Sequence, residues 1–270
     1  MISKRRFTIP IILLLFNFLI LLVLLTGCSN TENDPENFSD DFEGATRYKL
    51  TATYLDLEAL DTYPQRIEKI NSENPYNIIL LVKNQPYFNL EEVPYKKYNY
   101  SENIAQYLEP TEKIQTESEI VSEIAESFVS EDSSIQDIVV KALLWNKENI
   151  TYDKPLATRI FLNTKYTRSA EDTIKLKAGA CTEYANVFIA FMRHLGIPAR
   201  YVLGFYQAYE TIYYHAWAEV YLKGYGWIPV ETQDGKFGVP NYYVKLYVGK
   251  DLIDIDMDIY KINARYEIIE

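Results

Sequence analysis

The sequence GACTEYANVFIAFMRHLGIP occupies residues 179–198 and carries the pattern that decides the fold. Its apolar residues recur every three or four positions, which is typical of an amphipathic helix with one face in the core. Gly196 and Pro198 then provide the usual signals for the end of a helix. The stretch therefore predicts a core-facing helix of about fifteen residues that begins near Cys181.

Cys181 would lie in the first turn of this helix, where backbone amides have no intrahelical partner. The helix dipole and these amides favour a thiolate and can stabilise an oxyanion beside it. Glu183 is expected to stabilise the helix end rather than take part in catalysis. Taken alone, Cys181 fits equally well as a small buried residue, so its chemistry depends on its partners.

The sequence has two histidines, which limits the choice of a base. His194 falls in the last turn of the predicted helix, where the dipole explains a histidine without any catalytic role. His215 begins a strand-like run in which apolar and larger side chains alternate. One face of this strand would carry Ala216, Ala218, Val220 and Leu222, and the other His215, Trp217, Glu219 and Tyr221.

Glu231 lies sixteen residues after His215, in a run expected to return as its antiparallel partner. The length of the connecting loop decides which face Glu231 takes, because side chains alternate along a strand. A two-residue turn would set Glu231 opposite Ala218, away from His215. A three-residue loop at Lys223–Tyr225 would set it opposite Trp217, on the face of His215. An odd-length loop or a corrective bulge is therefore expected.

Glu219 is the alternative carboxylate, because it shares the predicted face of His215. It would become the next candidate if the loop were even in length. A surface position is nevertheless expected for it, since an isolated charge is seldom buried.

Four motifs occur in the order found in the transglutaminase-like domain: the Cys181 segment, LGIPARYVLGF at residues 195–205, the His215 segment and WIPVET at residues 227–232. The resemblance covers residues 110–240. It implies an α+β fold with a papain- or transglutaminase-like core, in which the cysteine helix packs on an antiparallel sheet. It also implies that Cys181 is the nucleophile, His215 the base and acid, and Glu231 the group that orients His215. The family usually has aspartate in this last role, so glutamate is a departure.

The N-terminus has the pattern of an export signal. Three basic residues at positions 4–6 precede an apolar run that ends in LTGC at residues 25–28. That ending resembles the lipobox of prokaryotic lipoproteins, which implies a signal peptide at residues 1–27 and a lipid on Cys28. The alternative is an uncleaved membrane anchor. Both place the remaining chain outside the cytoplasm.

Composition divides the rest of the chain into four segments. Residues 28–46 are polar and acidic with little to bury, as in a flexible tether. Residues 47–109 are expected to form a β-rich extension and residues 110–240 the catalytic domain. Residues 241–270 are expected to add strands that complete the sheet of that domain.

Local patterns predict individual elements in these segments. The expected strands are Tyr48–Tyr54 and Ile78–Val82; the expected helices are Ile120–Phe128, Ile135–Leu143 with a capping box at Ser133 and Gln136, and a short helix from Ser169. Tyrosines in residues 94–100 fit a sheet surface better than sugar stacking. Alternating acids at Ile253–Ile259 fit an amphipathic strand better than a calcium loop, because the glycine and closing glutamate of such a loop are missing.

The formal charge is −11 and becomes −14 without residues 1–27, which remove three basic residues and no acidic ones. Such a charge repels nucleic acid, so no nucleic-acid partner is expected. No cofactor or metal motif is visible. The features together imply a lipid-anchored, extracytoplasmic cysteine enzyme that acts on peptide or isopeptide amide bonds of envelope proteins or peptides. It would proceed through a thioester, as a hydrolase or a transamidase. The alternative is an inactive binding or scaffolding lipoprotein with the same fold.

Overall fold

The computed structural model describes residues 42–53, 55–71, 73, 75–84, 90–162, 166–208, 211–255 and 265–269. All of them belong to one compact unit that extends from Asp34 to Glu270. The predicted signal peptide, Cys28 and the tether up to residue 41 lie outside the described residues. Among the described helices, none combines the length and the hydropathy that a membrane span requires.

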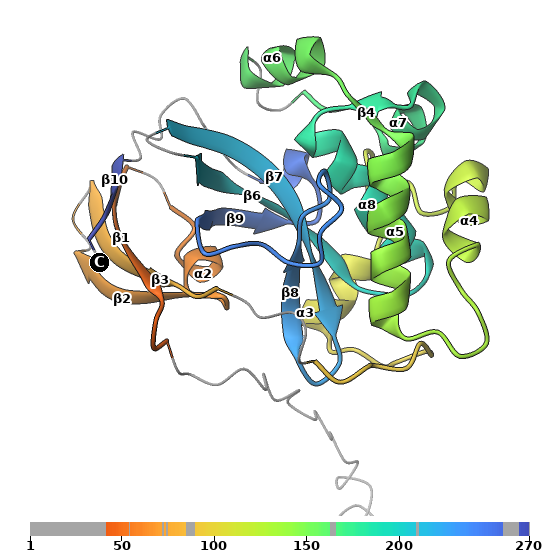
Figure 1. The fold of residues 1–270 in the computed structure, drawn as a ribbon, viewed down its shortest axis with the longest axis horizontal. Coiled ribbons are helices and arrows are strands. Elements are labelled where there is room, and N and C mark those ends of the chain that lie inside the picture. The colour runs from red at the N-terminus through yellow and green to blue at the C-terminus, as the bar shows by residue number, and fades with distance from the viewer. Residues whose placement is uncertain are drawn as a thin grey trace, which may run out of the picture. The chain divides into compact units, whose positions relative to one another are not determined.

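The centre of the unit is a four-stranded antiparallel sheet in the order β8-β7-β6-β9. Its strands are β6 (Ala199–Ala208), β7 (Thr211–Leu222), β8 (Gly226–Val230) and β9 (Tyr243–Gly249). Strand β7 has the predicted alternation, because its alanine, valine and leucine side chains from Ala216 to Leu222 enter the main core. This face of the sheet packs against a layer of helices (Figure 1).

Helix α8 (Cys181–His194) is the centre of that layer and begins at the predicted residue. It contacts β6 and β7 on one side and the helices α4, α5 and α7 on the other. Gly196 follows with a positive φ of 73°, which confirms the expected glycine at the helix end. The other helices are α4 (Glu119–Glu126), α5 (Ile135–Asn149), α6 (Lys154–Leu162) and α7 (Ala170–Leu176), the last capped by Ser169 as predicted.

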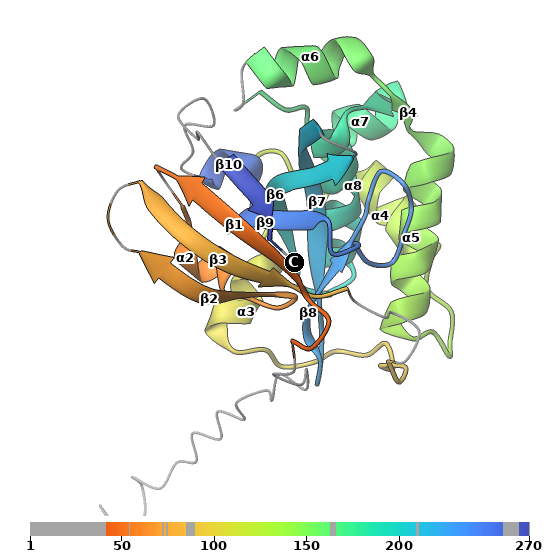
Figure 2. The ribbon, with the colours of Figure 1, turned by 60° about the vertical axis from the view of Figure 1, so that its left-hand side comes forward.

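A second antiparallel sheet has the strand order β10-β1-β3-β2. It comprises β1 (Thr46–Ala52), β2 (Gln65–Asn71), β3 (Tyr76–Val82) and β10 (Arg265–Ile268). The sheet lies on the side of the central sheet away from α5 and α8 (Figure 2). Apolar side chains from both sheets and from the helices form one continuous core. Short elements complete the fold: α2 (Leu57–Leu60), α3 (Glu102–Ala105), the 3₁₀ helices η2 (Gln106–Leu108) and η3 (Leu252–Asp254), and a parallel pair of β4 (Thr151–Tyr152) and β5 (Ala178–Gly179).

The expectation that residues 241–270 complete the central sheet holds for β9 but not for β10, the other strand described in this segment, which pairs with β1. A second expectation for this segment is wrong. The described start of the predicted strand Ile253–Ile259 is instead part of η3, whose first turn is capped by the Asp251 carboxylate. Residues 256–260 lie outside the described residues.

The capping box of α5 is also one residue later than predicted. Ser134 accepts from the Asp137 amide at 3.1 Å, and the Asp137 carboxylate accepts from the Ser134 amide. Gln136 has a different task, since its side chain accepts from the Val93 amide at 2.9 Å. It thereby holds the preceding loop against the helix.

The sequence suggested that the tyrosines in residues 94–100 lie on a sheet surface. They lie instead in a loop outside the regular strands. The Tyr95 hydroxyl donates to the Leu195 carbonyl at 3.0 Å, and Tyr100 packs edge-on against Tyr221 of β7. These rings attach a loop outside the regular strands to the central layers.

Candidate active site

Cys181 is the first residue of α8 and is partly exposed. The chain is positioned just before it by the short β4–β5 pair, in which Tyr152 lies opposite Gly179. The Asp153 amide also donates to the Gly179 carbonyl at 2.9 Å. Tyr152 is close enough to Cys181 that burial first, and the charge of Cys181 second, raise the pKa of its phenol.

Glu183 fixes the start of α8 from within the protein and has no exposed surface. Its Oε2 accepts from the Ala180 amide and the Thr182 hydroxyl, both at 2.9 Å. Its Oε1 accepts from the Thr167 hydroxyl at 2.9 Å and the Arg168 amide at 2.8 Å. Glu183 is therefore the helix-end stabiliser expected, and it also joins residues 167–168 to the helix.

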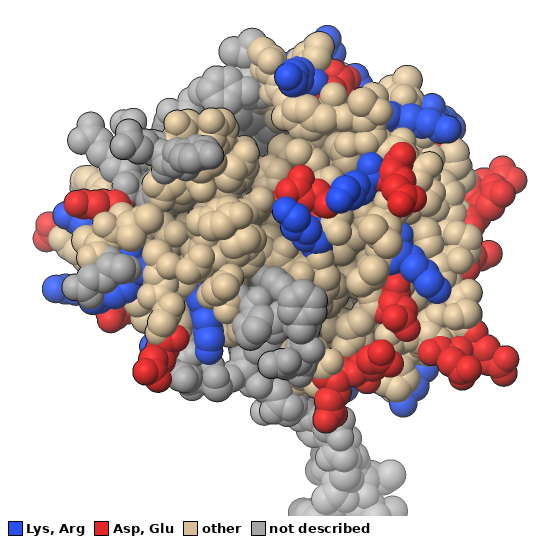
Figure 3. All heavy atoms as spheres, in the orientation of Figure 1, with Lys and Arg blue, Asp and Glu red and all other residues tan. Residues whose placement is uncertain are grey.

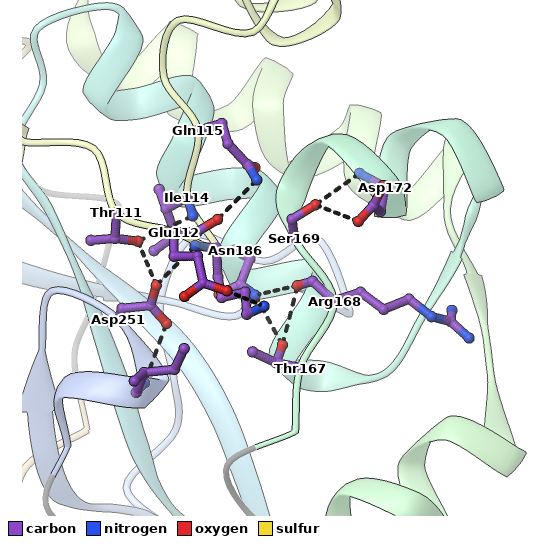
Figure 4. A network of polar contacts seen from close by, with 12 residues as sticks. Thr111, Glu112, Ile114, Gln115, Thr167, Arg168, Ser169, Asp172, Asn186 and Asp251 are labelled. Atoms are coloured by element: carbon purple, nitrogen blue, oxygen red, sulfur yellow. Dashed lines mark hydrogen bonds and ion pairs between the residues drawn. The ribbon is translucent and has the colours of Figure 1, made fainter.

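Asn186 adds to this support through Thr167 and the backbone of Arg168, as Figure 4 shows. The Asn186 amide donates to the Thr167 hydroxyl at 3.0 Å and to the Arg168 carbonyl at 2.9 Å. The Arg168 guanidinium binds the Asp153 carboxylate at 3.0 Å and the Ala178 carbonyl at 3.1 Å. Both sides of the segment that leads to Cys181 are thus held by hydrogen bonds.

The hairpin that carries His215 and Glu231 has an odd-length loop, as is required for both side chains to lie on the same face of the sheet. Strands β7 and β8 pair Ala218 with Val230 and Leu222 with Gly226, which leaves three residues, 223–225, in the loop. In this register Glu231 follows opposite Trp217, on the face of His215. The prediction of an odd loop is confirmed.

His215 and Glu231 are in direct contact. His215 Nε2 lies 2.8 Å from Glu231 Oε2, and the two residues are only 7% and 2% exposed. The other carboxylate oxygen, Oε1, accepts from the Gln233 amide at 3.0 Å. Tyr243 of β9 also hydrogen-bonds to Glu231; burial, then the charge of Glu231 and this hydrogen bond, raise the pKa of its phenol.

The imidazole of His215 also hydrogen-bonds to Cys181, so the three predicted residues form a chain of contacts. Burial would lower the pKa of His215. The charge of Glu231 and the hydrogen bonds to Cys181 and Glu231 outweigh it and raise this pKa to about 10. The arrangement favours an imidazolium flanked by two groups that can carry negative charge.

Aromatic rings enclose the imidazole. Tyr206 and Tyr243 meet it edge-on at 5.4 and 5.8 Å, and Trp217 lies nearly parallel to it at 6.3 Å between ring centroids. Gly204, opposite His215 in the sheet, makes room for the Trp217 ring: a Cβ there would lie 2.6 Å from that ring. No pattern in the sequence singles out Tyr206 or Tyr243, because they become neighbours of His215 only through strand register.

Glu219 is buried rather than on the surface, which corrects the expectation from sequence. It is 1% exposed and lies between Arg200 Nε and Lys245 Nζ, each at 2.7 Å. Burial disfavours its charge, but Arg200 and then Lys245 reverse this and lower the pKa of Glu219. Its charge is therefore neutralised away from His215.

His194 is also remote from the site, as expected. Its Nδ1 lies 2.9 Å from the Thr116 carbonyl oxygen, and its Nε2 lies 3.5 Å from Glu126 of α4. It contributes to the contact between α8 and α4.

A cavity of about 350 Å³ opens beside His215 and Glu231. Its other lining residues come from β6, from the loop after β8, and from β9 and the residue before it: Tyr206, Gln207, Ala208, Gln233, Asp234, Tyr242 and Tyr243. Within the described residues, no group of three or more His, Cys, Asp or Glu side chains is placed to hold a metal ion.

Residues 122–232 match the model of the transglutaminase-like superfamily. An uncharacterized protein from Haemophilus influenzae is 28% identical over 163 residues, which cover 52% of this chain and 43% of that protein. The chain thus spans less than half the length of this curated relative.

Among solved structures, a candidate cysteine protease from Cytophaga hutchinsonii has a TM-score of 0.56 and 19% identity. The alignment covers 84% of this chain and 91% of the other, so the likeness in fold extends beyond residues 122–232. The periplasmic domain of TgpA from Pseudomonas aeruginosa has a TM-score of 0.40 and 18% identity, over 60% of this chain and 56% of that domain. The stretch that matches the transglutaminase-like superfamily thus contains Cys181, His215 and Glu231, and it forms a cysteine helix on an antiparallel sheet.

Proposed function

We propose that this protein is a cysteine enzyme that cleaves or exchanges amide bonds through a thioester. The observation that carries the proposal is the chain of contacts Cys181–His215–Glu231, with a buried imidazole of raised pKa between a thiol and a carboxylate. A nucleophile beside a base that is itself oriented by a third group is the arrangement that acyl transfer needs. The transglutaminase-like family match supports the same class of chemistry.

In the first half of the reaction the Cys181 sulfur attacks the carbonyl carbon of the substrate amide. The oxyanion forms next to the first amides of α8, which have no intrahelical acceptor. The His215 imidazolium then gives its proton to the departing nitrogen, and the C–N bond breaks. The products are a free amine and a thioester on Cys181.

In the second half, water or an amine attacks the thioester carbonyl carbon. His215 takes the proton from this nucleophile, the C–S bond breaks, and the thiolate–imidazolium pair returns. Water gives a carboxylic acid, and an amine gives a new amide. The same three side chains serve both outcomes, and we propose hydrolysis as the main one because water is always present.

We propose that the substrate is a protein or peptide of the cell envelope and that the enzyme is tethered there by a lipid on Cys28. The support is the LTGC motif and the preceding apolar run. The tether is tested by metabolic labelling with a palmitate analogue. Label that persists after Cys28→Ala would contradict it.

The reaction is tested with peptides of a casein digest in the presence of neutral hydroxylamine, which converts thioesters to hydroxamates. We expect hydroxamate or hydrolysed products from the wild type and at least about a hundredfold less from Cys181→Ala and His215→Ala. Equal product from wild type and Cys181→Ala would contradict the proposal. An unreactive Cys181 in a folded protein would favour a binding or scaffolding role for the domain.

A further inference from the structure

The cavity beside His215 has no role in the acyl-transfer steps described above. His215 and Glu231 form part of its wall, whereas Cys181 is not among the described residues that line it. The cavity therefore lies on the imidazole–carboxylate side of the site, away from the sulfur. A substrate whose scissile amide lies at Cys181 would have to extend past the imidazole of His215 to place a group in this cavity.

The wall of the cavity is suited to a positive charge. It contains the carboxylates of Glu231 and Asp234, and none of its described residues is basic. Glu231 is committed to His215, whereas the Asp234 side chain is 52% exposed and can meet a ligand. A carboxylate at the rim of a cavity whose described lining holds no basic residue can attract an ammonium or guanidinium group.

Stacked tyrosine rings provide the second part of such a site. The rings of Tyr206 and Tyr243 lie 5.3 Å apart with planes 20° from parallel, and Tyr213 continues the stack on Tyr206 at 5.3 Å. Tyr242 adjoins Tyr243 at 5.4 Å and is largely exposed. Tyr213 and Tyr243 cover the two faces of Tyr206, so the stack holds these rings in place without a ligand. The exposed ring of Tyr242 is the one that can offer a face to a cation.

The ammonium group of Lys236 already forms an ion pair with the Asp234 carboxylate. Lys236 Nζ lies 3.0 Å from Asp234 Oδ2, although Lys236 does not line the cavity. Both side chains are more than half exposed, so the pair contributes little to stability and can be exchanged for a substrate cation. Lys236 is thus a competitor whose removal should strengthen ligand binding.

We propose that this cavity is a specificity site for a cationic side chain on the amine side of the scissile amide. The inference rests on the proposed function, because His215 gives its proton to the departing amine, and the chain beyond that amine then continues past the imidazole. The recognised cation is a lysine- or arginine-like side chain. It is distinct from the reacting nitrogen, which is uncharged when it attacks or departs.

The test measures binding to the full chain carrying Cys181→Ala, by calorimetric titration. The probes are N-acetyl-lysine methylamide and its uncharged isostere N-acetyl-norleucine methylamide. We expect the lysine probe to bind about tenfold more tightly. Asp234→Asn should reduce this ratio to about threefold or less, and Lys236→Met should increase it, because one removes the carboxylate and the other the competitor. Asp132→Asn, which removes an exposed acid from the loop between α4 and α5, should leave the ratio unchanged.

Equal binding of the two probes, or a ratio that ignores Asp234→Asn, would overturn the inference. Tighter binding of N,N′-diacetylchitobiose than of the lysine probe would also overturn it and assign the tyrosines to sugar stacking. Because Cys181 is absent from the tested chain, the charge preference does not depend on thiol chemistry. If the lysine probe binds more tightly but Cys181 of the wild type proves unreactive, only the proposed function is contradicted. If Cys181 is reactive but the two probes bind equally, only the assignment of the cavity is contradicted.

Discussion

Glu231 shows how a carboxylate with one more methylene than aspartate can be held in place beside a histidine. One oxygen meets His215 at 2.8 Å, and the other accepts from the Gln233 amide at 3.0 Å. Tyr243, on the edge strand β9, adds a hydrogen bond. These donors remove the rotamer freedom that the longer side chain would otherwise have. Tyr243 therefore acts through Glu231, as a positioning residue.

Tyr243→Phe should slow the alkylation of Cys181 by neutral iodoacetamide about tenfold at pH 7, because a hydrogen bond to a charged group is worth about 1.5 kcal/mol or more. The ring stack and the fold should remain. Tyr213→Phe is the matched control, since this exposed ring lies in the same stack but does not touch Glu231. An alkylation rate equal to that of the control would show that Tyr243 does not position Glu231.

The imidazole of His215 should titrate far above the ordinary histidine value. Burial favours the neutral ring, but the charge of Glu231 and the hydrogen bonds raise its pKa to about 10. Glu231→Gln removes the negative charge and should lower this pKa by more than about one unit. NMR spectra of protein with ¹³C-labelled histidine will report it, because the sequence has only two histidines. A His215 signal that titrates near pH 6.5 in the wild type would contradict this.

At this scale the sequence could predict that Cys181, His215 and Glu231 come together, because one thiol besides Cys28, two histidines and the odd loop of a hairpin leave few choices. It could not predict that Glu219 is buried. The two cations that neutralise this residue, Arg200 of β6 and Lys245 of β9, come together with it only through the register of three strands, which single residues do not reveal. An isolated acid therefore had to be assigned to the surface.

Among the elements, helix α8 depends on a buried carboxylate in its own first turn. Glu183 receives four hydrogen bonds, two from the helix start and two from residues 167–168. Gly179 is needed beside it, because a Cβ at that position would lie 2.5 Å from the Glu183 Cβ. The position of Cys181 is thus tied to a contact that crosses between segments.

Glu183→Ala should lower the free energy of unfolding by about 2–5 kcal/mol, because it leaves several buried donors without an acceptor. Urea denaturation followed by circular dichroism measures this. Glu119→Ala is the matched control: it removes an exposed acid from the first turn of α4 and should cost about 0.5–1 kcal/mol or less. Equal losses in the two variants would mean that the Glu183 contacts are dispensable.

Periodicity predicts long elements better than it predicts their ends. Helices α5 and α8 follow from apolar spacing, but Ser133 and Ser134 are equally good cap residues, and only the contact of Gln136 with Val93 decides between them. Helix α6, which has nine residues, was not among the predicted helices.

In the whole molecule, the second sheet is joined to the central one by buried polar contacts as well as by the core. Gln65 of β2 donates to the Lys245 carbonyl at 3.0 Å, and the Tyr48 hydroxyl of β1 donates to the Asn241 carbonyl at 2.9 Å. Lys245 also binds the buried Glu219. On the face shown in Figure 3, acidic and basic side chains are interspersed over the surface. The charges of Glu219, Arg200 and Lys245 differ from these because they are buried.

Glu219→Gln should destabilise the protein by about 3–5 kcal/mol, since it leaves the buried cations of Arg200 and Lys245 without their shared anion. Burial already lowers the pKa of Lys245 to about 8, despite the opposing charge of Glu219. Adding Lys245→Met to Glu219→Gln should restore part of the loss, because it removes one unpaired charge. Urea midpoints of the single and double variants will check both parts. A loss below about 1 kcal/mol for Glu219→Gln would contradict the role of this network.

The arrangement of the whole molecule was harder to predict than that of the part that carries Cys181, His215 and Glu231. The pairing of β10 with β1 joins residues 265–268 to residues 48–51, a contact that no local pattern announces. The region before residue 110 therefore appeared as an extension, whereas its side chains share one core with α8 and β9.

The central claim is that Cys181 is activated by His215 and Glu231. The most direct test is the rate of alkylation of Cys181 by iodoacetamide against pH, in a Cys28→Ala background that leaves one thiol. Wild type should label rapidly at about pH 6–7, where an ordinary thiol reacts slowly. His215→Ala and Glu231→Ala should both slow it at least tenfold, by roughly 1.4 kcal/mol or more. Labelling that follows an ordinary thiol curve and ignores His215→Ala would contradict the account.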